Sequence, residues 1–456
     1  RYFTFFMVSP IINPYLYFEG KGPDLSMNTI KTAGIIAEYN PFHNGHHYQI
    51  EQVRRQTGAD YVIAVMSGDF VQRGEPAIFD KYTRTNMALR GGADLVVELP
   101  TLFATSSAED FSACGVALLE KLGTDILCFG SESGNLELLQ KAADILVAEP
   151  EGWSILLQKY LKQGESYPSA RSKACAEYTR EPELSELLSS PNNILAVEYL
   201  KALRRRNSSM TAVTIRREGA GYHDTAPAPA CRNSDSRLFF ASASALRKQI
   251  LEQQSRICTD GPLPAVITDQ MPPAVLDALL TEDALTAPLF ADDLTGLLNY
   301  RLLSAIQKQE DLSQFSDLSP ELAARLTKQA LQFTPFGERI AQLKTRSYTY
   351  TRISRALLHL ILGMTTEQTA QAKVLDYAPY ARILGFKKSA GPLLSHLREK
   401  SRIPLITKTA DARNILSPEA MSILETDFYA SHLYHSLLAS KGRVIRNEYT
   451  KSVIVL

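Results

Sequence analysis

The chain has 456 residues, of which 45% are hydrophobic and 21% are charged. These values are ordinary for a globular protein of two or three domains, and a chain of this length buries a large core without disulfides or structural metals. Lysine plus arginine and aspartate plus glutamate each number 49, so the formal net charge is zero. The total charge therefore gives no indication of a nucleic-acid partner, although a balanced total can hide a segregated one.

The cysteines are odd in number, far apart and never spaced as CxxC; they are Cys114, Cys128, Cys175, Cys231 and Cys258. This pattern argues against a disulfide framework and a thiolate zinc site, and it predicts a reducing, cytoplasmic location. We interpret residues 1–26 as a non-native or upstream extension before a natural start at Met27, because they are rich in aromatics and broken by Pro10 and Pro14. Their apolar run is too short to span a bilayer, and no later segment reaches that length.

From Met27 onward, apolar runs typical of buried strands alternate with helical patterns. The runs are TAGIIAEYN (32–40), DYVIAVMSG (60–68), ADLVVELP (93–100), TDILCFGSE (124–132) and MTAVTIRRE (210–218). Continuously apolar strands that alternate with helices predict a parallel sheet covered on both faces. The fold class is therefore α/β, with a doubly wound, Rossmann-like parallel sheet.

After about residue 250 the strand signals fade, and residues 273–308, 319–344, 350–363 and 391–400 have helical patterns. Four prolines, Pro262, Pro264, Pro272 and Pro273, indicate a linker. We therefore predict two domains, an α/β domain at 27–250 and a mostly helical domain at 265–456.

Charge is segregated within the helical part. Between Glu338 and Arg413 there are fourteen lysines and arginines against five acidic residues. Aromatic residues, among them Tyr348, Tyr350, Tyr377, Tyr380 and Phe386, interleave with these charges. The stretch is either a solvated helical surface or a footprint for a phosphate backbone, in which the rings stack on exposed bases.

Three of the eight histidines stand within AEYNPFHNGHHYQI, where the first strand ends and the first helix begins. Ligands of doubly wound sheets bind beyond the carboxyl ends of the strands, and helix N-termini attract anions there. His43 and His46 flank Gly45 and can donate hydrogen bonds to phosphate oxygens where negative charge develops. Three histidines could also bind zinc, but no cysteine or acidic residue is spaced to complete such a site. The His43-Asn44-Gly45-His46 string resembles the HxGH motif of the nucleotidyltransferase superfamily.

That superfamily has a second motif, ISSTxxR, which supplies hydroxyls and an arginine to nucleotide phosphates. The segment from Ser242 to Arg247 matches it in spacing, with Ser244 at the threonine position and Ala243 in place of the second serine. An ordinary serine-capped helix gives the same pattern. The order of the two motifs along one chain favours the phosphate-binding interpretation.

Longer strings resemble one family in particular, that of the bacterial tRNA(Met) cytidine acetate ligases. They are EYNPFHNGH (38–46), SGDFVQRGEPA (67–77), RTNMALRGGADLVVELP (84–100), FGSE (129–132), SPNNILAVEYLKAL (190–203), GAGYHD (219–224), YTYTRISRALLHLILG (348–363) and YARILGFKKSAGPLLSHLREKSRIPLITK (380–408). The resemblance covers the chain from Met27 onward, and only ETDFYASHLY (425–434) matches the family pattern loosely.

The resemblance implies a ligase that uses ATP and acetate. Acetate attacks the α-phosphate to give acetyl-adenylate and pyrophosphate. The N4 amine of the wobble cytidine in elongator tRNA(Met) then takes the acetyl group, which gives N4-acetylcytidine and AMP. Such an enzyme must neutralise phosphate charge and admit a splayed-out base.

The resemblance also implies the site residues. The catalytic pair is His43 and His46. The ATP-binding set comprises Ile36, Ala37, Glu38, Tyr39, Asn40, Pro41, Phe42, His43, Asn44, Gly45, His46, His47, Tyr48 and Gln49, followed by Gly130, Asn193, Arg216, Ser244 and Arg247.

Some of these residues have a plainer interpretation. Gly130 could be a turn glycine, and Asn193 could cap its helix. Because Arg216 and Arg217 end one strand, we expect one to face the site and the other solvent, and the family pattern favours Arg216. His47 lies outside the motif, so we do not assign it a catalytic role.

Other motif residues stay open. Arg73 and Lys81 flank GEPA and could bind acetate or pyrophosphate or form surface ion pairs, while His223 could order its loop. We expect no dedicated metal site, and Mg²⁺ would arrive with the ATP phosphates. We assign tRNA binding to Arg382, Lys387 and Lys388, and we see no membrane or protein partner. The rival functions are a small-molecule adenylyltransferase and a tRNA-binding protein without catalysis.

Overall fold

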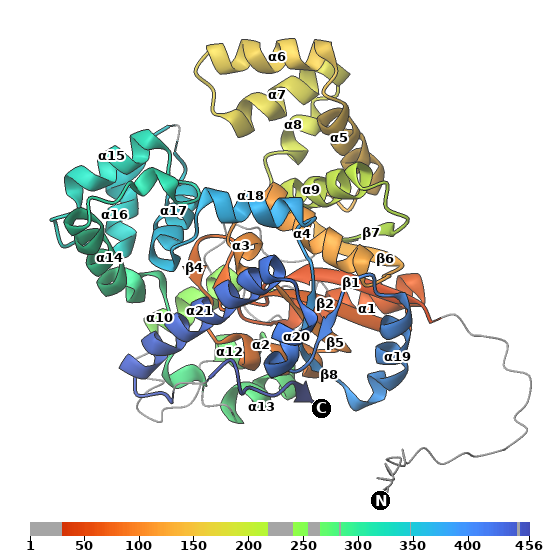
Figure 1. Cartoon of the computed structure of the whole chain (residues 1–456). Helices are drawn as coiled ribbons and strands as arrows, with labels where there is room; N and C mark the ends of the chain where they lie inside the picture. The colour runs from red at the N-terminus through yellow and green to blue at the C-terminus, as the bar shows by residue number, and fades with distance from the viewer. Residues whose placement is uncertain (1–29, 218–239, 254–264, 282–283, 347, 445–446) are drawn as a thin grey trace, which may run out of the picture.

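The fold is described from a computed structural model, which describes residues 30–217, 240–253, 265–281, 284–346, 348–444 and 447–456. Its centre is an eight-stranded sheet in the order β10-β8-β5-β2-β1-β6-β7, with β9 beside β8 (Figure 1). The strands are β1 (Thr32–Ala37), β2 (Tyr61–Ser67), β5 (Leu95–Leu99), β6 (Ile126–Ser131), β7 (Thr211–Arg216), β8 (Ala381–Phe386), β9 (Leu405–Ile406) and β10 (Ile454–Val455).

All five predicted strands are present as β1, β2, β5, β6 and β7, and they are parallel to one another. Most of their side chains are buried, and both faces of the sheet carry a hydrophobic cluster. Continuous apolar runs are expected of strands that lose water on both sides. The doubly wound α/β prediction is therefore confirmed.

Helices lie between these strands, as the alternating pattern predicts. They are α1 (Asn44–Thr57), α2 (Lys81–Arg90), α3 (Thr101–Ala104), α4 (Ala108–Lys121) and α5 (Leu136–Ala148). A further helical group, α6 (Glu151–Lys162), α7 (Tyr167–Thr179), α8 (Glu183–Leu187) and α9 (Pro191–Arg205), precedes β7. In Figure 1 α6, α7 and α8 project from the top of the molecule, whereas α9 packs back on α4 and α5.

The C-terminal part is largely helical, as predicted. After α10 (Ala243–Glu252) it contains α12 (Ala265–Thr268), α13 (Pro273–Thr281), α14 (Thr295–Gln307), α15 (Pro320–Gln329), α16 (Phe336–Leu343), α17 (Tyr350–Leu362), α18 (Thr366–Val374), α19 (Gly391–Lys400), α20 (Ala412–Ile415) and α21 (Pro418–Ser440), with short 3-10 turns between them. Helices α14 to α17 form the group at the left of Figure 1. Among the residues in the described ranges, no helix is long and apolar enough to cross a membrane.

The predicted division into an α/β domain at 27–250 and a separate domain at 265–456 is wrong in one respect. Strands β8, β9 and β10 come from the C-terminal part, yet they complete the central sheet. Strand β8 pairs antiparallel with β5, and the register joins Glu98 to Arg382 and Leu95 to Phe386. The sequence ARILGF was missed as a strand because it is short and lies within a basic stretch.

A ring of four buried charges, which we call the ion quartet, joins the two parts of the chain. Lys81 Nζ lies 2.7 Å from Glu98 and 2.9 Å from Glu448, and Arg382 lies 2.8 Å from Glu98 and 2.6 Å from Glu448. All four residues are at most 3% exposed. Burial and Arg382 disfavour the charged form of Lys81, but the two carboxylates outweigh them and raise its pKa. Each charge in the quartet is therefore compensated by two of opposite sign.

The quartet also corrects one assignment and settles another. Arg382 was predicted to bind tRNA, but its guanidinium is buried and engaged with Glu98, Glu448 and the Tyr82 hydroxyl, so it cannot reach an RNA phosphate. Lys81 was expected to bind acetate or pyrophosphate or to form a surface ion pair. It is instead fully buried within the quartet.

The quartet generates a stability prediction. We expect Arg382→Ala to lower the free energy of unfolding by about 3–5 kcal/mol, because it leaves two buried carboxylates short of a cation. Arg413 is a matched control, since its pair with Glu425 is exposed, and Arg413→Ala should cost less than about 1 kcal/mol. Urea denaturation of both variants measures the difference, and equal midpoints would contradict the role of the quartet.

Candidate active site

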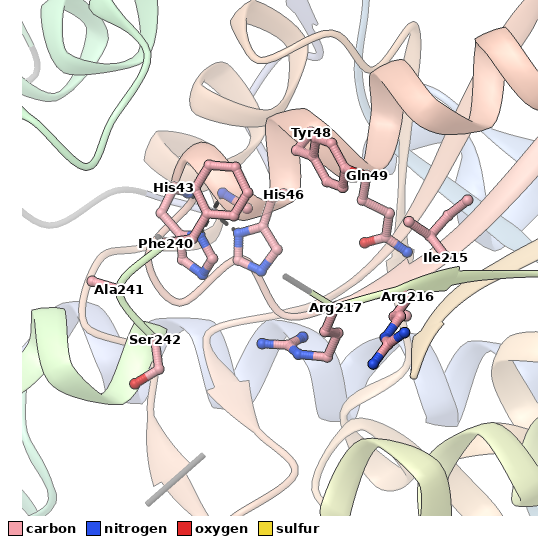
Figure 2. Close-up of a pocket in the computed structure, with 12 residues that line it drawn as sticks. His43, His46, Tyr48, Gln49, Ile215, Arg216, Arg217, Phe240, Ala241 and Ser242 are labelled. Atoms are coloured by element: carbon pink, nitrogen blue, oxygen red, sulfur yellow. Dashed lines mark hydrogen bonds between the residues drawn. The ribbon is translucent and has the colours of Figure 1, made fainter. Parts of the chain in front are cut away.

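The candidate site lies at the carboxyl edge of the parallel strands, where ligands of such sheets bind. A pocket of about 550 Å³, its open mouth included, occupies the space between α1, β6, β7 and the start of α10. Figure 2 shows the residues around it. They are His43, Gly45, His46, Tyr48, Gln49, Gly130, Ile215, Arg216, Arg217, Phe240, Ala241 and Ser242.

The two predicted catalytic histidines stack on each other at the N-terminus of α1. Their ring centroids are 3.8 Å apart, with 27° between the ring planes. His43 Nδ1 accepts a hydrogen bond from the Gly45 N–H at 3.0 Å, and His46 Nδ1 accepts one from the His43 N–H at 3.2 Å. A neutral imidazole that accepts at Nδ1 carries its proton on Nε2. Both histidines therefore keep an Nε2–H donor for a ligand.

Electrostatics keep both rings uncharged. Burial, together with the positive charges of Arg217 and Arg247, lowers the pKa of His43 to about 3. Burial, His43 and Arg217 also hold the pKa of His46 well below its usual value. At neutral pH both histidines are uncharged hydrogen-bond donors. Such donors suit an anion whose negative charge is already offset by the neighbouring arginines.

The N-terminus of α1 differs from the expectation that its free N–H groups bind the anion. The N–H of Asn44 donates to the Gln270 carbonyl at 2.9 Å, that of Gly45 to His43 Nδ1, and that of His46 to the His43 carbonyl at 2.9 Å. The first turn is thus satisfied within the protein. Direct contacts to a phosphate fall to the imidazoles and the arginines, and the helix contributes its dipole.

The preceding residues of the predicted ATP loop support the histidines rather than line the pocket. Tyr39 and Phe42 are buried, and their rings lie 4.9 and 5.5 Å from that of His46. Glu38 accepts from the Gln72 N–H at 2.9 Å, and Asn40 accepts from the Ile78 N–H at 2.8 Å. Ile36, Ala37, Pro41 and Asn44 are likewise outside the pocket lining.

His47, by contrast, turns away from the pocket. Its Nδ1 lies 2.9 Å from the Gly91 carbonyl, and its Nε2 lies 3.2 Å from Glu51. Although His47 is adjacent to His46 in the sequence, its side chain points toward Gly91 and Glu51 and away from the pocket. This placement agrees with leaving His47 outside the catalytic pair.

Arg216 and Arg217 both line the pocket, so the expectation that one faces solvent is not met. Figure 2 shows their side chains side by side below His46 and Gln49. Strand alternation would separate them, but β7 ends at Arg216, so the alternation does not extend to Arg217. Arg217, which the family pattern did not favour, is the one whose charge acts on both histidines.

The second motif is tied to the first by Arg247. Its guanidinium donates to the Asn40 carbonyl at 2.7 Å and to the Ser244 hydroxyl at 3.2 Å. Ser242 caps α10 by accepting from the Ala245 N–H at 3.2 Å and also lines the pocket. Ser242 is therefore a helix cap that stands at the edge of the candidate site, and phosphate binding by this segment stays a prediction.

Gly130 lines the pocket, whereas Asn193 does not. A side chain at Gly130 would make only ordinary contact with Arg217, at 3.4 Å, so the protein alone does not require glycine there. Asn193 is buried, accepts from the Ser133 N–H at 3.1 Å and donates its own N–H to Glu132 at 2.8 Å. It shapes the turn after β6 and is not a helix cap, since Ser190 occupies that position.

Sequence reasoning missed four contributors, namely Ile215, Phe240, Ala241 and Gln270. The first three line the pocket but carry no chemical signal. Gln270 accepts from the Ala241 N–H at 2.8 Å through its side chain and from Asn44 through its carbonyl. It therefore joins the α10 entrance to α1. His223, the proposed loop-ordering residue, lies outside the described residues.

The predicted RNA-binding lysines lie at the other edge of the sheet. Lys387 follows β8, and its N–H donates to the carbonyl of Asp94, the residue just before β5. Lys388 is exposed beside it. Since β8 runs antiparallel to β5, this end of β8 lies at the amino edge of the parallel strands, opposite the histidines.

Of the basic stretch at 338–413, Arg339, Arg355 and Arg382 are buried. Lys344 and Arg346 are exposed in the connection between α16 and α17. Arg352, on the first turn of α17, lies with its guanidinium 5.0 Å from the centre of the Tyr348 ring. The basic residues of this stretch are thus spread over several places. The α16–α17 group adjoins the carboxyl edge through the contact of α17 with β4 (Glu75–Pro76).

Metal ligands are scarce at the candidate site. Within the described residues no group of three or more histidines, cysteines, aspartates or glutamates could hold a metal ion. The pocket lining contains imidazoles, guanidiniums, an amide and two hydroxyls but no carboxylate, whereas Mg²⁺ is bound mainly through oxygen.

A parallel sheet with two neutral imidazoles at the first strand–helix junction is the arrangement of a nucleotidyltransferase. The family model described as HIGH Nucleotidyl Transferase matches residues 30–449 of this chain. The chain is 38% identical over 435 residues to the tRNA(Met) cytidine acetate ligase of Acetivibrio thermocellus, covering 94% of this chain and 100% of that protein. It is 37% identical to that of a Thermoanaerobacter species over 88% of this chain and 94% of that protein. The chain belongs to the tRNA(Met) cytidine acetate ligase family.

Solved structures agree with this relationship. The apo crystal structure of Thermotoga maritima TmcAL superposes with a TM-score of 0.82 at 30% identity, covering 93% of this chain and 99% of that one. A second structure of the Thermotoga maritima protein, bound with alpha-thio ATP, superposes with a TM-score of 0.80 over the same shares.

The histidine geometry generates the second prediction. We expect His46→Ala to slow adenylate formation about 10²- to 10³-fold, because it removes one preorganised donor. His47→Ala is the matched control, since the same change one residue later affects a ring that faces Gly91 and Glu51. Pyrophosphate release from ATP measures both variants. Equal losses in the two would mean that the helix and not the Nε2–H donor is responsible.

Proposed function

We propose that the protein is an ATP-dependent acetate ligase that acetylates N4 of the wobble cytidine in elongator tRNA(Met). The stacked pair of neutral Nε2–H donors beside Arg216 and Arg217 is the observation that carries the proposal. Such a pair suits stabilisation of the charge that develops at an α-phosphate. Family membership supplies the acetate and tRNA parts of the proposal.

In the first half-reaction an acetate oxygen attacks the α-phosphorus of ATP, and pyrophosphate leaves. His43 and His46 donate to the α-phosphate oxygens, and Arg216 and Arg217 offset the charge of the triphosphate. Because the imidazoles are neutral, they donate hydrogen bonds without transferring a proton. Mg²⁺ would be held by the phosphate oxygens rather than by pocket carboxylates, and it would neutralise further charge when bound.

In the second half-reaction the N4 amine attacks the acetyl carbonyl, and AMP leaves. The RNA must bring a single unstacked base to the carboxyl edge of the sheet, where the adenylate has formed. Lys344, Arg346 and Arg352 adjoin that edge through α17, so we propose that they contact the tRNA backbone near the reacting base. Lys387 and Lys388 remain a second candidate surface.

The two half-reactions are expected to separate. ATP and acetate without tRNA should give acetyl-adenylate and pyrophosphate, since the phosphate-binding groups all belong to this chain. Addition of tRNA(Met) and labelled acetate should give N4-acetylcytidine, detected by nucleoside analysis. Transfer of AMP to a small molecule would support an adenylyltransferase instead, and tRNA binding without ATP turnover would support a non-catalytic protein.

The two basic surfaces can be compared with equal charge changes. We expect the double variant Lys344→Ala and Arg346→Ala to bind tRNA more weakly, with a salt slope shallower by about 0.7–0.9 for each phosphate that the side chains no longer neutralise. The double variant Lys387→Ala and Lys388→Ala removes the same charge at the opposite edge of the sheet. A salt titration of tRNA affinity that affected only the second variant would favour the β8 surface. Adenylate formation is the control for an intact ATP site.

A further inference from the structure

The connection between α12 and α13 touches the entrances of both helices that carry the nucleotide motifs. Gln270, which lies in this connection, is only 7% exposed. Its side-chain oxygen accepts a hydrogen bond from the Ala241 N–H at 2.8 Å, and its main-chain carbonyl accepts one from the Asn44 N–H at 2.9 Å. Helix α1 begins at Asn44, and Ala241 directly precedes the cap of α10. One residue therefore joins the two helix entrances.

At the α1 entrance the connection makes two bonds to the same residue. Besides the main-chain bond to Gln270, the Asn44 side-chain amide donates to the Asp269 carbonyl at 2.9 Å. Asn44 stands between His43 and Gly45, and the Gly45 N–H donates to His43 Nδ1. The two carbonyls thus fix the residue around which the histidine pair is built.

At the α10 entrance the Gln270 side chain holds one edge of the pocket. Phe240, Ala241 and Ser242 all line the pocket, and we call them the α10 edge. Figure 2 shows them on the same side of the pocket as His43. A Cβ at Gly45 would lie 3.6 Å from the Phe240 Cβ, so the α10 edge lies close to the first turn of α1. The bond from Ala241 to Gln270 therefore sets where this edge stands relative to the histidines.

The connection has a rigid support behind it. Helix α13 packs against α2, and the buried side chains of Met271, Val275 and Leu279 belong to the hydrophobic cluster on this face of the sheet. The same cluster contains Ile50 of α1 and Ile250 of α10. Because close-packed side chains resist displacement, Gln270 is held in a fixed place from which it can position its two neighbours.

The Gln270 bond differs from the other link between the two motifs. Arg247 also joins α10 to the loop after β1, but it does so from the second turn of α10. The Gln270 bond acts at Ala241 itself, which lines the pocket and is 3% exposed. A buried N–H that loses its acceptor is costly, so the acceptor oxygen matters here and not only the volume of the side chain.

We propose that Gln270 is a positioning residue for ATP binding, an inference that rests on the proposed function. Its side-chain oxygen holds the α10 edge at the distance from His43 and His46 that the nucleotide requires. The empty pocket then already has the shape of the occupied one, and little ordering is needed when ATP binds. Gln270 therefore affects the affinity for ATP, whereas the histidines affect the bond-making step.

Two substitutions of nearly equal size separate the oxygen from the volume. Gln270→Met keeps the length of the side chain but removes the acceptor, and Gln270→Glu keeps an oxygen at the same position. We expect Gln270→Met to raise the Kd of ATP, and its KM in pyrophosphate release, about 3- to 10-fold, the scale of one hydrogen bond. The kcat at saturating ATP should stay close to wild type. Gln270→Glu should recover most of the affinity.

The matched control is Gln56→Met, the same change at an exposed position farther along α1. It should leave the Kd of ATP unchanged. Wild-type affinity in Gln270→Met would mean that the side chain only fills space, and an equal loss in Gln270→Glu would mean that the oxygen is not responsible. A fall in kcat with an unchanged Kd would likewise overturn the inference.

A second measurement does not depend on the folding of a variant. Hydrogen exchange of the Ala241 amide in the wild-type protein should be slow, because Gln270 accepts its proton. Fast exchange at this amide overturns the inference. A wild-type protein that binds ATP, depends on Gln270 for affinity and never acetylates tRNA overturns the proposed function alone. A wild-type protein that does not bind ATP overturns both.

Discussion

The ion quartet is the constraint on which the arrangement of the two halves depends. Lys81 and Glu98 come from the N-terminal part, whereas Arg382 and Glu448 come from the C-terminal part. Two buried cations and two buried anions are stable only when all four are in contact, because desolvation penalises any charge left alone. The quartet thereby fixes β8 against β5 and holds the C-terminal part in one position relative to the sheet.

This fixed position has a consequence for the candidate site. Helix α17 meets the hairpin of β3 (Phe70–Val71) and β4 (Glu75–Pro76) at Gly74, and the hairpin meets the ATP loop through the bond of the Gln72 N–H to Glu38. A chain of direct contacts therefore runs from the helical part to the histidines. Reacting groups held this way need little reorganisation when a substrate arrives, which is the condition for efficient positioning.

The ATP side is organised by buried arginines that bind carbonyl oxygens. Arg84 donates to the carbonyls of Glu38 and Ser67, at 2.7 and 3.0 Å, and so joins the ends of β1 and β2. Arg247, on α10, likewise donates to the Asn40 carbonyl and so joins α10 to the loop after β1. The positive charge of Arg247 remains near the pocket and helps to keep His43 neutral. Structural support and electrostatic adjustment thus come from the same side chain.

The sequence by itself determined the parallel strands, the first helices and the histidine pair. Apolar runs specify buried strands because water is excluded from both faces, and HNGH specifies a strand–helix junction through its glycine and its cap. The two nucleotide motifs were recognisable because each is short and local. Their attachment through Arg247 and Asn40 was not, since it joins residues 207 positions apart.

Only the tertiary structure decided the roles of the charges. Arg382, Lys81 and Lys388 look alike in the sequence, yet the first two are buried in the quartet and the third is exposed. The partners of Arg382 lie 284 and 66 positions away, so no local pattern contains them. A charged side chain faces solvent, contacts RNA or joins a buried ion quartet according to the groups that surround it in space. Packing between distant segments of the chain sets those surroundings.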